Sequence, residues 1–179
     1  MALKYKSKNK PYRTGYFLVG QGHELYYELV GNPNGIPVVH LHGGPGAGFQ
    51  QKDRDYYNPK KFNALLFDQR GSNHSKPLAE TKNNTTQLLV KDIEKLMDFV
   101  GFQKAIIVGG SWGSTLALVF AIQHPKRVSA LLIRGIYLAN RFSRNHFYFG
   151  GVQSFFPDVH EKFLLCCTII LGWVGITPK

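Results

Sequence analysis

The stretch AIIVGGSWG, residues 105–113, decides the fold of this chain. Its four leading apolar residues predict a buried strand, and residues 114–124 have the character of a helix. Ser111 therefore lies where a strand turns sharply into a helix, and small neighbours leave room for strained backbone dihedrals. The turn exposes the serine hydroxyl at the positive end of a helix and frees the backbone N–H of Trp112 to bind a developing oxyanion. We predict that Ser111 is a nucleophile, with Trp112 as one oxyanion donor and with Gly110 and Gly113 supporting the turn.

A second motif, HGGPG at residues 42–46, follows the apolar strand predicted at 37–41. Backbone without side chains can approach a substrate carbonyl closely, so we predict that Gly44 supplies the second oxyanion N–H. Gly43 and Pro45 shape the loop. His42 is interpreted as a structural hydrogen-bonding residue and not as a base, because it precedes the nucleophile in the chain. The alternative is a glycine-rich turn without a catalytic role.

A third motif, DQRG at residues 68–71, follows the strand predicted at 63–67. Asp68 and Arg70 are expected to form a charge-assisted pair that ties this loop to the site, with Gln69 between them. An ordinary surface ion pair is the alternative. We assign all three residues a supporting role near the pocket.

The remaining pattern predicts an α/β protein. Residues 15–19 and 23–30 are expected to form an antiparallel hairpin that turns at 20–22. A helix capped by Thr85 or Thr86 and ended by Gly101 precedes the central strand, and another strand is predicted at 128–133. Strands that alternate with helices indicate a mostly parallel sheet with helices on both faces.

Composition narrows the class of protein. The chain has 179 residues, of which 44% are hydrophobic and 18% charged, as expected for a globular domain. No apolar run reaches the roughly 18 residues of a membrane span. The N-terminus has no apolar signal segment, and the adjacent Cys166 and Cys167 make no disulfide framework, so we expect a cytoplasmic location. The net charge of +11 comes from scattered Lys and Arg, interpreted as a solvated basic surface without a nucleic-acid or membrane partner. No cluster has metal-ligand spacing, so neither a metal nor another cofactor is expected.

Together the three motifs resemble the proline iminopeptidases of the α/β-hydrolase fold, from about residue 15 to residue 164. The resemblance implies a serine peptidase that releases N-terminal proline from small peptides through an acyl-enzyme. It divides the chain into a basic extension (1–14), a partial α/β-hydrolase core (15–139), the start of a cap domain (140–164) and a divergent apolar tail (165–179). The chain is thus expected to hold the N-terminal part of the sheet, with the cap only begun.

The resemblance also implies an Asp or Glu and then a His after the serine. Ser111 is followed by two carboxylates and three histidines, namely Asp158, Glu161, His124, His146 and His160. His124 is expected at a helix end, and the others fall in the segment that matches the cap. We therefore expect the true Asp and His beyond the region that this chain covers. A C-terminally truncated chain of this kind is expected to be nearly inactive and marginally folded.

Two other functions stay open. An esterase of the same fold shares the serine turn and the oxyanion loop, whereas an epoxide hydrolase would carry Asp in place of Ser111. A non-catalytic binding protein could keep the half-fold as an interaction surface. The sequence leaves the oligomeric state undetermined.

Overall fold

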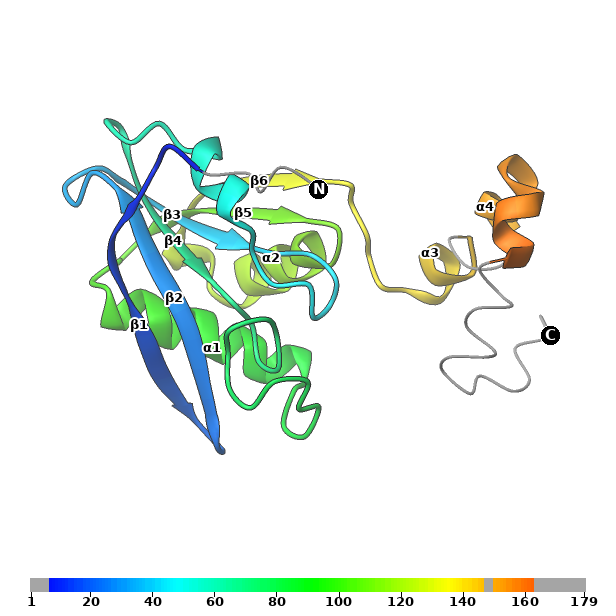
Figure 1. Cartoon of the computed structure of the whole chain (residues 1–179), viewed down its shortest axis with the longest axis horizontal. Coiled ribbons are helices and arrows are strands. Elements are labelled where there is room, and N and C mark those ends of the chain that lie inside the picture. The colour runs from blue at the N-terminus through cyan, green and yellow to red at the C-terminus, as the bar shows by residue number, and fades with distance from the viewer. Residues whose placement is uncertain (1–6, 147–149, 163–179) are drawn as a thin grey trace, which may run out of the picture. The chain divides into compact units, whose positions relative to one another are not determined.

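The computed structural model describes residues 7–146 and 150–162, and the chain divides into two compact units after Tyr137 (Figure 1). The predicted tail at 165–179, with Cys166 and Cys167, lies outside the described residues, as does the start of the basic extension. The predicted division into an extension, a core and a cap stays a prediction.

The first unit is built on one six-stranded sheet with the order β1-β2-β4-β3-β5-β6. β1 (Pro11–Gly20) and β2 (His23–Gly31) form the expected antiparallel hairpin, and β2 pairs antiparallel with β4 (Phe62–Phe67). β3 (Ile36–Leu41), β4, β5 (Ala105–Gly110) and β6 (Val128–Arg134) all run parallel. This mixed, mostly parallel sheet confirms the predicted fold class.

Two α-helices cover one face of the sheet. α1 (Thr86–Phe99) begins after the N-cap Thr85, whose hydroxyl accepts from Leu88 N at 3.4 Å, and Gly101 follows its end with φ 81°. α2 (Trp112–Gln123) begins directly after Ser111. The apolar sides of both helices share one core cluster with β2 to β5. Both predicted helices are therefore present, and they leave the C-terminal ends of β3 and β5 free to carry loops.

The opposite face of the sheet is covered by a shorter segment. The 3₁₀ helix η1 (Gln51–Tyr56) is flanked by Phe49 and Tyr57, which form a second buried cluster with residues of β2, β3 and β4. A second 3₁₀ helix, η2 (Pro125–Arg127), joins α2 to β6. The segment that carries η1 connects β3 to β4, so it also forms one wall above the end of β3.

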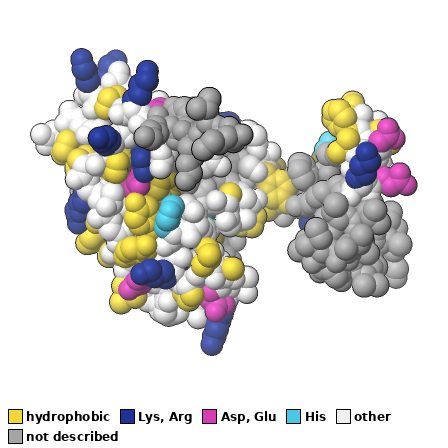
Figure 2. All heavy atoms as spheres, viewed as in Figure 1, with side chains coloured by type: hydrophobic (Ala, Val, Ile, Leu, Met, Phe, Trp, Pro, Cys, Tyr) yellow, Lys and Arg dark blue, Asp and Glu magenta, His cyan; other side chains and the backbone are white. Residues whose placement is uncertain are grey.

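The second unit, described by itself, contains two short helices. α3 (Arg141–Asn145) is capped by Asn140, whose side-chain oxygen accepts from Ser143 N at 2.7 Å, and α4 (Gly151–Phe155) follows. Within 7–146 and 150–162, no helix is long and apolar enough to cross a membrane. On the face seen in Figure 2, Lys and Arg side chains stand at several separate places on the first unit.

Candidate active site

Ser111 has the backbone conformation that a nucleophile at a sharp turn requires. Its φ is 55° and its ψ is −122°, between the end of β5 and the start of α2, and the residue is exposed. Ser111 N donates to Arg134 O at 3.1 Å, and Ser111 O accepts from Ser114 N at 2.8 Å and from Ser114 Oγ at 2.6 Å. A non-glycine residue at such dihedrals is strained and persists only where its surroundings fix it. Here β6 and the first turn of α2 do so.

The glycines around Ser111 are required by the close approach of backbone. A Cβ on Gly109 would overlap the carbonyl of Gly113, and one on Gly113 would overlap the carbonyl of Leu41 in β3. A Cβ on Gly110 would meet a side chain, at 3.1 Å from Arg134 Cζ. The strand, the turn and the helix are therefore packed together with no space for larger residues at 109 and 113.

The loop at residues 42–46 lies directly against this turn. A Cβ on Gly43 would lie 3.1 Å from Gly110 O and 3.4 Å from Ser111 Cβ. Gly44 has φ 122°, and a Cβ there would lie 2.6 Å from Gly46 N, so the bend needs glycine. The loop backbone is thus beside the serine, and the role of Gly44 as an oxyanion donor stays a prediction.

His42 joins two loops through both of its ring nitrogens. Gln69 N donates to Nε2 at 2.9 Å, and Nδ1 lies 2.8 Å from Gly43 O, to which it donates. Burial lowers the pKa of His42, which favours the neutral ring that this bonding pattern needs. A residue with both nitrogens engaged in this way has no free lone pair for a serine proton.

Gln69 connects all three motifs. Its buried side chain donates from Nε2 to His42 O at 2.9 Å, while Oε1 accepts from Trp112 Nε1 at 3.0 Å. The DQRG loop therefore sets the distance between the glycine-rich loop and the residue that follows Ser111. Motif spacing indicated that these loops converge, but not that Gln69 bridges them.

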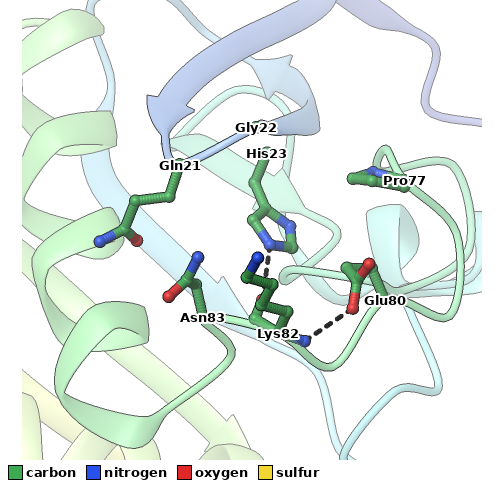
Figure 3. Close-up of a pocket in the computed structure, with 7 residues that line it drawn as sticks. All are labelled: Gln21, Gly22, His23, Pro77, Glu80, Lys82 and Asn83. Atoms are coloured by element: carbon green, nitrogen blue, oxygen red, sulfur yellow. Dashed lines mark hydrogen bonds between the residues drawn. The ribbon is translucent and has the colours of Figure 1, made fainter.

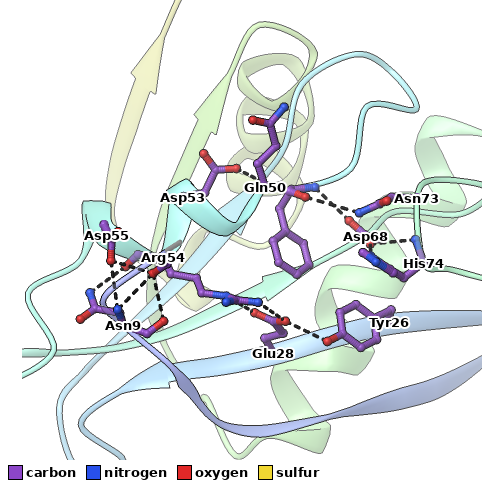
Figure 4. Close-up of polar contacts among 12 residues, drawn as sticks. Asn9, Tyr26, Glu28, Gln50, Asp53, Arg54, Asp55, Asp68, Asn73 and His74 are labelled. Atoms are coloured by element: carbon purple, nitrogen blue, oxygen red, sulfur yellow. Dashed lines mark hydrogen bonds and ion pairs between the residues drawn. The ribbon is translucent and has the colours of Figure 1, made fainter. Parts of the chain in front are cut away.

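The expected pair between Asp68 and Arg70 is wrong. Asp68 accepts from Phe49 N at 2.9 Å and from His74 N at 3.1 Å, and His74 Nδ1 also lies 3.1 Å from its carboxylate (Figure 4). The chain turns after β4, where Ser72 N bonds to Gln69 O at 3.0 Å, and the two side chains contact different elements. Asp68 thus holds the loop at 48–49 and the loop at 73–74, not Arg70.

Arg70 pairs instead with Asp92 of α1. Its Nε and Nη2 lie 2.6 and 2.8 Å from the two carboxylate oxygens, and both side chains are at most 1% exposed. Gln21 Oε1 and Asn83 O accept further bonds from Arg70 at 2.9 and 2.8 Å. Asp92 is not among the site residues predicted from the sequence. The sequence nevertheless contains an indication of its burial, because Asp92 falls on the same side of the helix as the buried Leu89, Ile93 and Leu96.

A second ion pair, with a buried carboxylate and a partly buried guanidinium, fixes η1 on the sheet. Arg54 donates twice to Glu28 of β2, at 2.7 Å each, and Tyr26 OH donates to the same carboxylate at 2.8 Å (Figure 4). Burial, together with Glu28, raises the pKa of Tyr26, which stays a donor. The wall that η1 forms is therefore rigidly placed.

Ser111 lines a pocket of about 230 Å³ between this wall and the ends of β3, β5 and β6. Its other lining residues include His40, Gly43, Lys52, Asp53, Gly110 and Arg134. Tyr57 OH lies 2.7 Å from His40 Nδ1, and burial lowers the pKa of His40 to about 4. Burial raises the pKa of Tyr57, so the phenol is the donor in this bond. His40 is therefore neutral at pH 7.

None of the histidines in the described ranges forms a hydrogen bond with the Ser111 hydroxyl. His124 caps the far end of α2, as expected, with Nδ1 3.1 Å from Glu94 Oε1. His146 and His160 belong to the second unit. In the part of the chain that the structure describes, no three His, Cys, Asp or Glu residues gather as metal ligands.

A separate pocket, of about 260 Å³, lies at the β1–β2 turn (Figure 3). His23 Nε2 lies 2.9 Å from Lys82 O, and Glu80 accepts from Lys82 N at 2.7 Å. This pocket shares no lining residue with the Ser111 pocket. The candidate active site is therefore the pocket at Ser111.

The family described as the alpha/beta hydrolase fold matches residues 36–156, which span β3 to β6 and the Ser111 turn. The chain belongs to the alpha/beta hydrolase fold family. This hydrolase-family chain is 46% identical over 154 residues to a proline iminopeptidase of Xylella fastidiosa strain 9a5c, covering 86% of the chain and 49% of the relative. It is 44% identical to a proline iminopeptidase of Arabidopsis thaliana, covering 86% of the chain and 40% of the relative. The chain thus spans about half the length of these curated relatives or less.

Solved structures show the same fold as this family member. The proline iminopeptidase-related protein of Thermus thermophilus matches with a TM-score of 0.60 and 31% identity, over 68% of this chain and 43% of that one. A 2-hydroxy-6-oxo-6-phenylhexa-2,4-dienoate hydrolase of a Rhodococcus species matches with a TM-score of 0.58 and 25% identity, over 70% and 46%. The predicted resemblance to proline iminopeptidases is confirmed by the identities to the two relatives above.

Proposed function

We propose that this chain provides the nucleophile and the oxyanion loop of a serine hydrolase that releases N-terminal proline from small peptides. The observation that carries the proposal is the backbone of Ser111, with φ 55° and ψ −122° at a strand-to-helix turn. The similarity to proline iminopeptidases supports the choice of substrate. An esterase of this fold shares the turn. The proposed serine chemistry is therefore argued from Ser111, and the proposed substrate is argued from the similarity to the relatives.

In the proposed reaction, Ser111 Oγ attacks the carbonyl carbon of the N-terminal proline. The N–H groups of Trp112 and Gly44 hold the oxyanion of the tetrahedral intermediate. A base takes the proton of the Ser111 hydroxyl and passes it to the leaving nitrogen as the C–N bond breaks, so the shortened peptide leaves as an amine. Water hydrolyses the prolyl ester and restores the serine.

Ser111 needs a base and a carboxylate that orients it. In residues 7–146 and 150–162 no histidine bonds to its hydroxyl, and His40 and His42 are engaged elsewhere. We assign the base and the carboxylate to the half of the relatives that this chain does not span.

A chimera tests this proposal. Residues 1–137 of this chain would be joined to the C-terminal half of the Xylella fastidiosa relative, and hydrolysis of a proline arylamide would be measured. We expect turnover by the chimera, a loss of roughly 10⁴-fold or more in its Ser111→Ala variant, and little turnover by the 179-residue chain alone. Ser129→Ala, at an exposed serine of β6, is the matched control and should keep the rate.

Labelling with a fluorophosphonate probe gives a second readout on the same chimera. We expect labelling that Ser111→Ala removes and Ser129→Ala retains. Persistent labelling of the Ser111→Ala variant would reject Ser111 as the nucleophile. A folded chimera that cleaves simple acyl esters and leaves the proline arylamide intact would support the esterase instead.

A further inference from the structure

Arg134 lies next to the proposed nucleophile. It is the last residue of β6, and its carbonyl accepts the hydrogen bond from Ser111 N at 3.1 Å. Its side chain lies over the backbone of Gly110, because a Cβ built there would be 3.1 Å from Cζ and 3.2 Å from Nε. The guanidinium therefore borders the pocket beside Ser111, where Arg134 is a lining residue.

The pocket carries an excess of positive charge. Among the described residues, neither Arg134 nor Lys52 of η1 forms an ion pair, although both line the pocket and are exposed. Arg54 and Arg70, in contrast, are each held by two bonds to a carboxylate.

The other titratable groups of the pocket offset only part of this charge. The carboxylate of Asp53 already accepts from Gln50 N at 2.7 Å and lies 3.8 Å from His40 Nε2. His40 is buried and neutral, with Nδ1 bound to Tyr57 OH. The pocket lining thus holds two cationic side chains and one carboxylate, which leaves a net positive charge.

We propose that Arg134, assisted by Lys52, binds the C-terminal carboxylate of a dipeptide substrate, and so selects proline dipeptides with a free C-terminus. The inference rests on the proposed function. A guanidinium binds a carboxylate through two parallel hydrogen bonds, which an amide cannot accept. Lys52 adds a point charge from the opposite wall.

The dimensions of a dipeptide fit this arrangement. Its carboxylate carbon follows the leaving nitrogen by two bonds, so it lies within about 4 Å of the carbonyl carbon that Ser111 attacks. Each additional residue moves the carboxylate outward by up to about 3.5 Å. Arg134 touches the residue before Ser111, so it is placed for the shortest peptides.

Binding to the full chain tests the proposal without catalysis. Pro-Ala and Pro-Ala-amide would be titrated by NMR against the wild-type chain and the Arg134→Gln, Arg134→Lys, Lys52→Gln and Lys60→Gln variants. We expect the wild type to bind the acid about tenfold more tightly than the amide, as for a charge-assisted bond. Arg134→Gln should bind both equally, Arg134→Lys and Lys52→Gln should keep part of the preference, and Lys60→Gln should keep all of it. Lys60 lies outside this pocket.

Three results would overturn the proposal. They are equal affinities of the acid and the amide in the wild type, an undiminished preference in Arg134→Gln, and no saturable binding of either peptide at any soluble concentration. The NMR spectrum of each variant shows whether the protein is folded, so that a loss of binding is distinguished from a loss of structure.

A parallel titration compares N-acetyl-alanine with its amide, neither of which contains proline. It separates this inference from the proposed function. If the acid preference persists while the chimera described above does not cleave, the carboxylate site stands and the peptidase proposal fails. If the chimera cleaves and the preference is absent, only the carboxylate site fails.

Discussion

His40 is a buried titratable residue in the lining of the Ser111 pocket, and burial lowers its pKa from 6.5 to about 4. Between these two pH values the unfolded chain takes up a proton on this side chain and the folded chain does not. The free energy of unfolding should therefore fall as the pH decreases from about 6.5 to about 4, by up to about 3 kcal/mol from this residue. Urea unfolding at pH 7 and pH 4.5 measures the loss.

His40→Gln isolates this contribution, because His42 is also buried with a lowered pKa and adds to the same slope. The variant should lose less stability on acidification than the wild type does. If the variant does not fold, the imidazole C–H resonance of His40 in the wild type should titrate near pH 4. A midpoint near 6.5 would contradict the assignment.

At the scale of single residues, the sequence is most informative where backbone geometry dictates the residue type. Strand, serine and glycines together predicted the turn at Ser111, whose positive φ the structure contains. Side-chain direction after a strand was not predictable in this way. Asp68 and Arg70 are two residues apart, yet the local turn places them against different elements, and Arg70 finds Asp92 across 22 residues of chain.

The buried pair of Arg70 and Asp92 joins the loop after β4 to α1, so it belongs to the packing of elements. Arg70→Met leaves a buried carboxylate without its partner, and we expect a loss of about 3–5 kcal/mol in the free energy of unfolding. Arg70→Met combined with Asp92→Leu removes both charges and should recover most of that loss. Urea unfolding of the single and double variants measures this.

Lys91→Met is the matched control, since Lys91 is the exposed neighbour of Asp92 on α1. It should change stability by less than about 0.5 kcal/mol. A double variant as unstable as Arg70→Met would show that the pair stabilises the fold beyond the mutual neutralisation of its charges.

The elements themselves were largely predictable, because apolar runs and caps are local signals. β1 begins at Pro11, four residues before the expected start, because its register pairs Pro11 with Val30 of β2. Such pairing depends on residues distant in the sequence. The cover that η1 provides on the second face rests on the Glu28–Arg54 pair, which is equally non-local.

At the scale of the molecule, β6 is an edge strand of the sheet with an exposed apolar face. Leu132 is 62% exposed, while its neighbour Leu131 packs against the core cluster. Exposed apolar edges favour association, so Leu132→Lys should lower concentration-dependent self-association in sedimentation velocity. The same change at Leu131 should instead lower the free energy of unfolding. Equal association of wild type and Leu132→Lys would exclude this face as its cause.

The bond from Ser111 N to Arg134 O links the serine to β6, one of the two edge strands of the described sheet. When β6 frays, the amide proton of Ser111 loses its acceptor and becomes open to exchange with solvent deuterium. The exchange rate of this single amide proton therefore reports how often the edge of the sheet opens. A molecule that pairs with β6 should slow this hydrogen exchange. It should also slow the relaxation of the strained Ser111 backbone toward ordinary dihedrals. The backbone conformation of Ser111 is therefore coupled to the pairing of β6, in addition to its bonds with the first turn of α2.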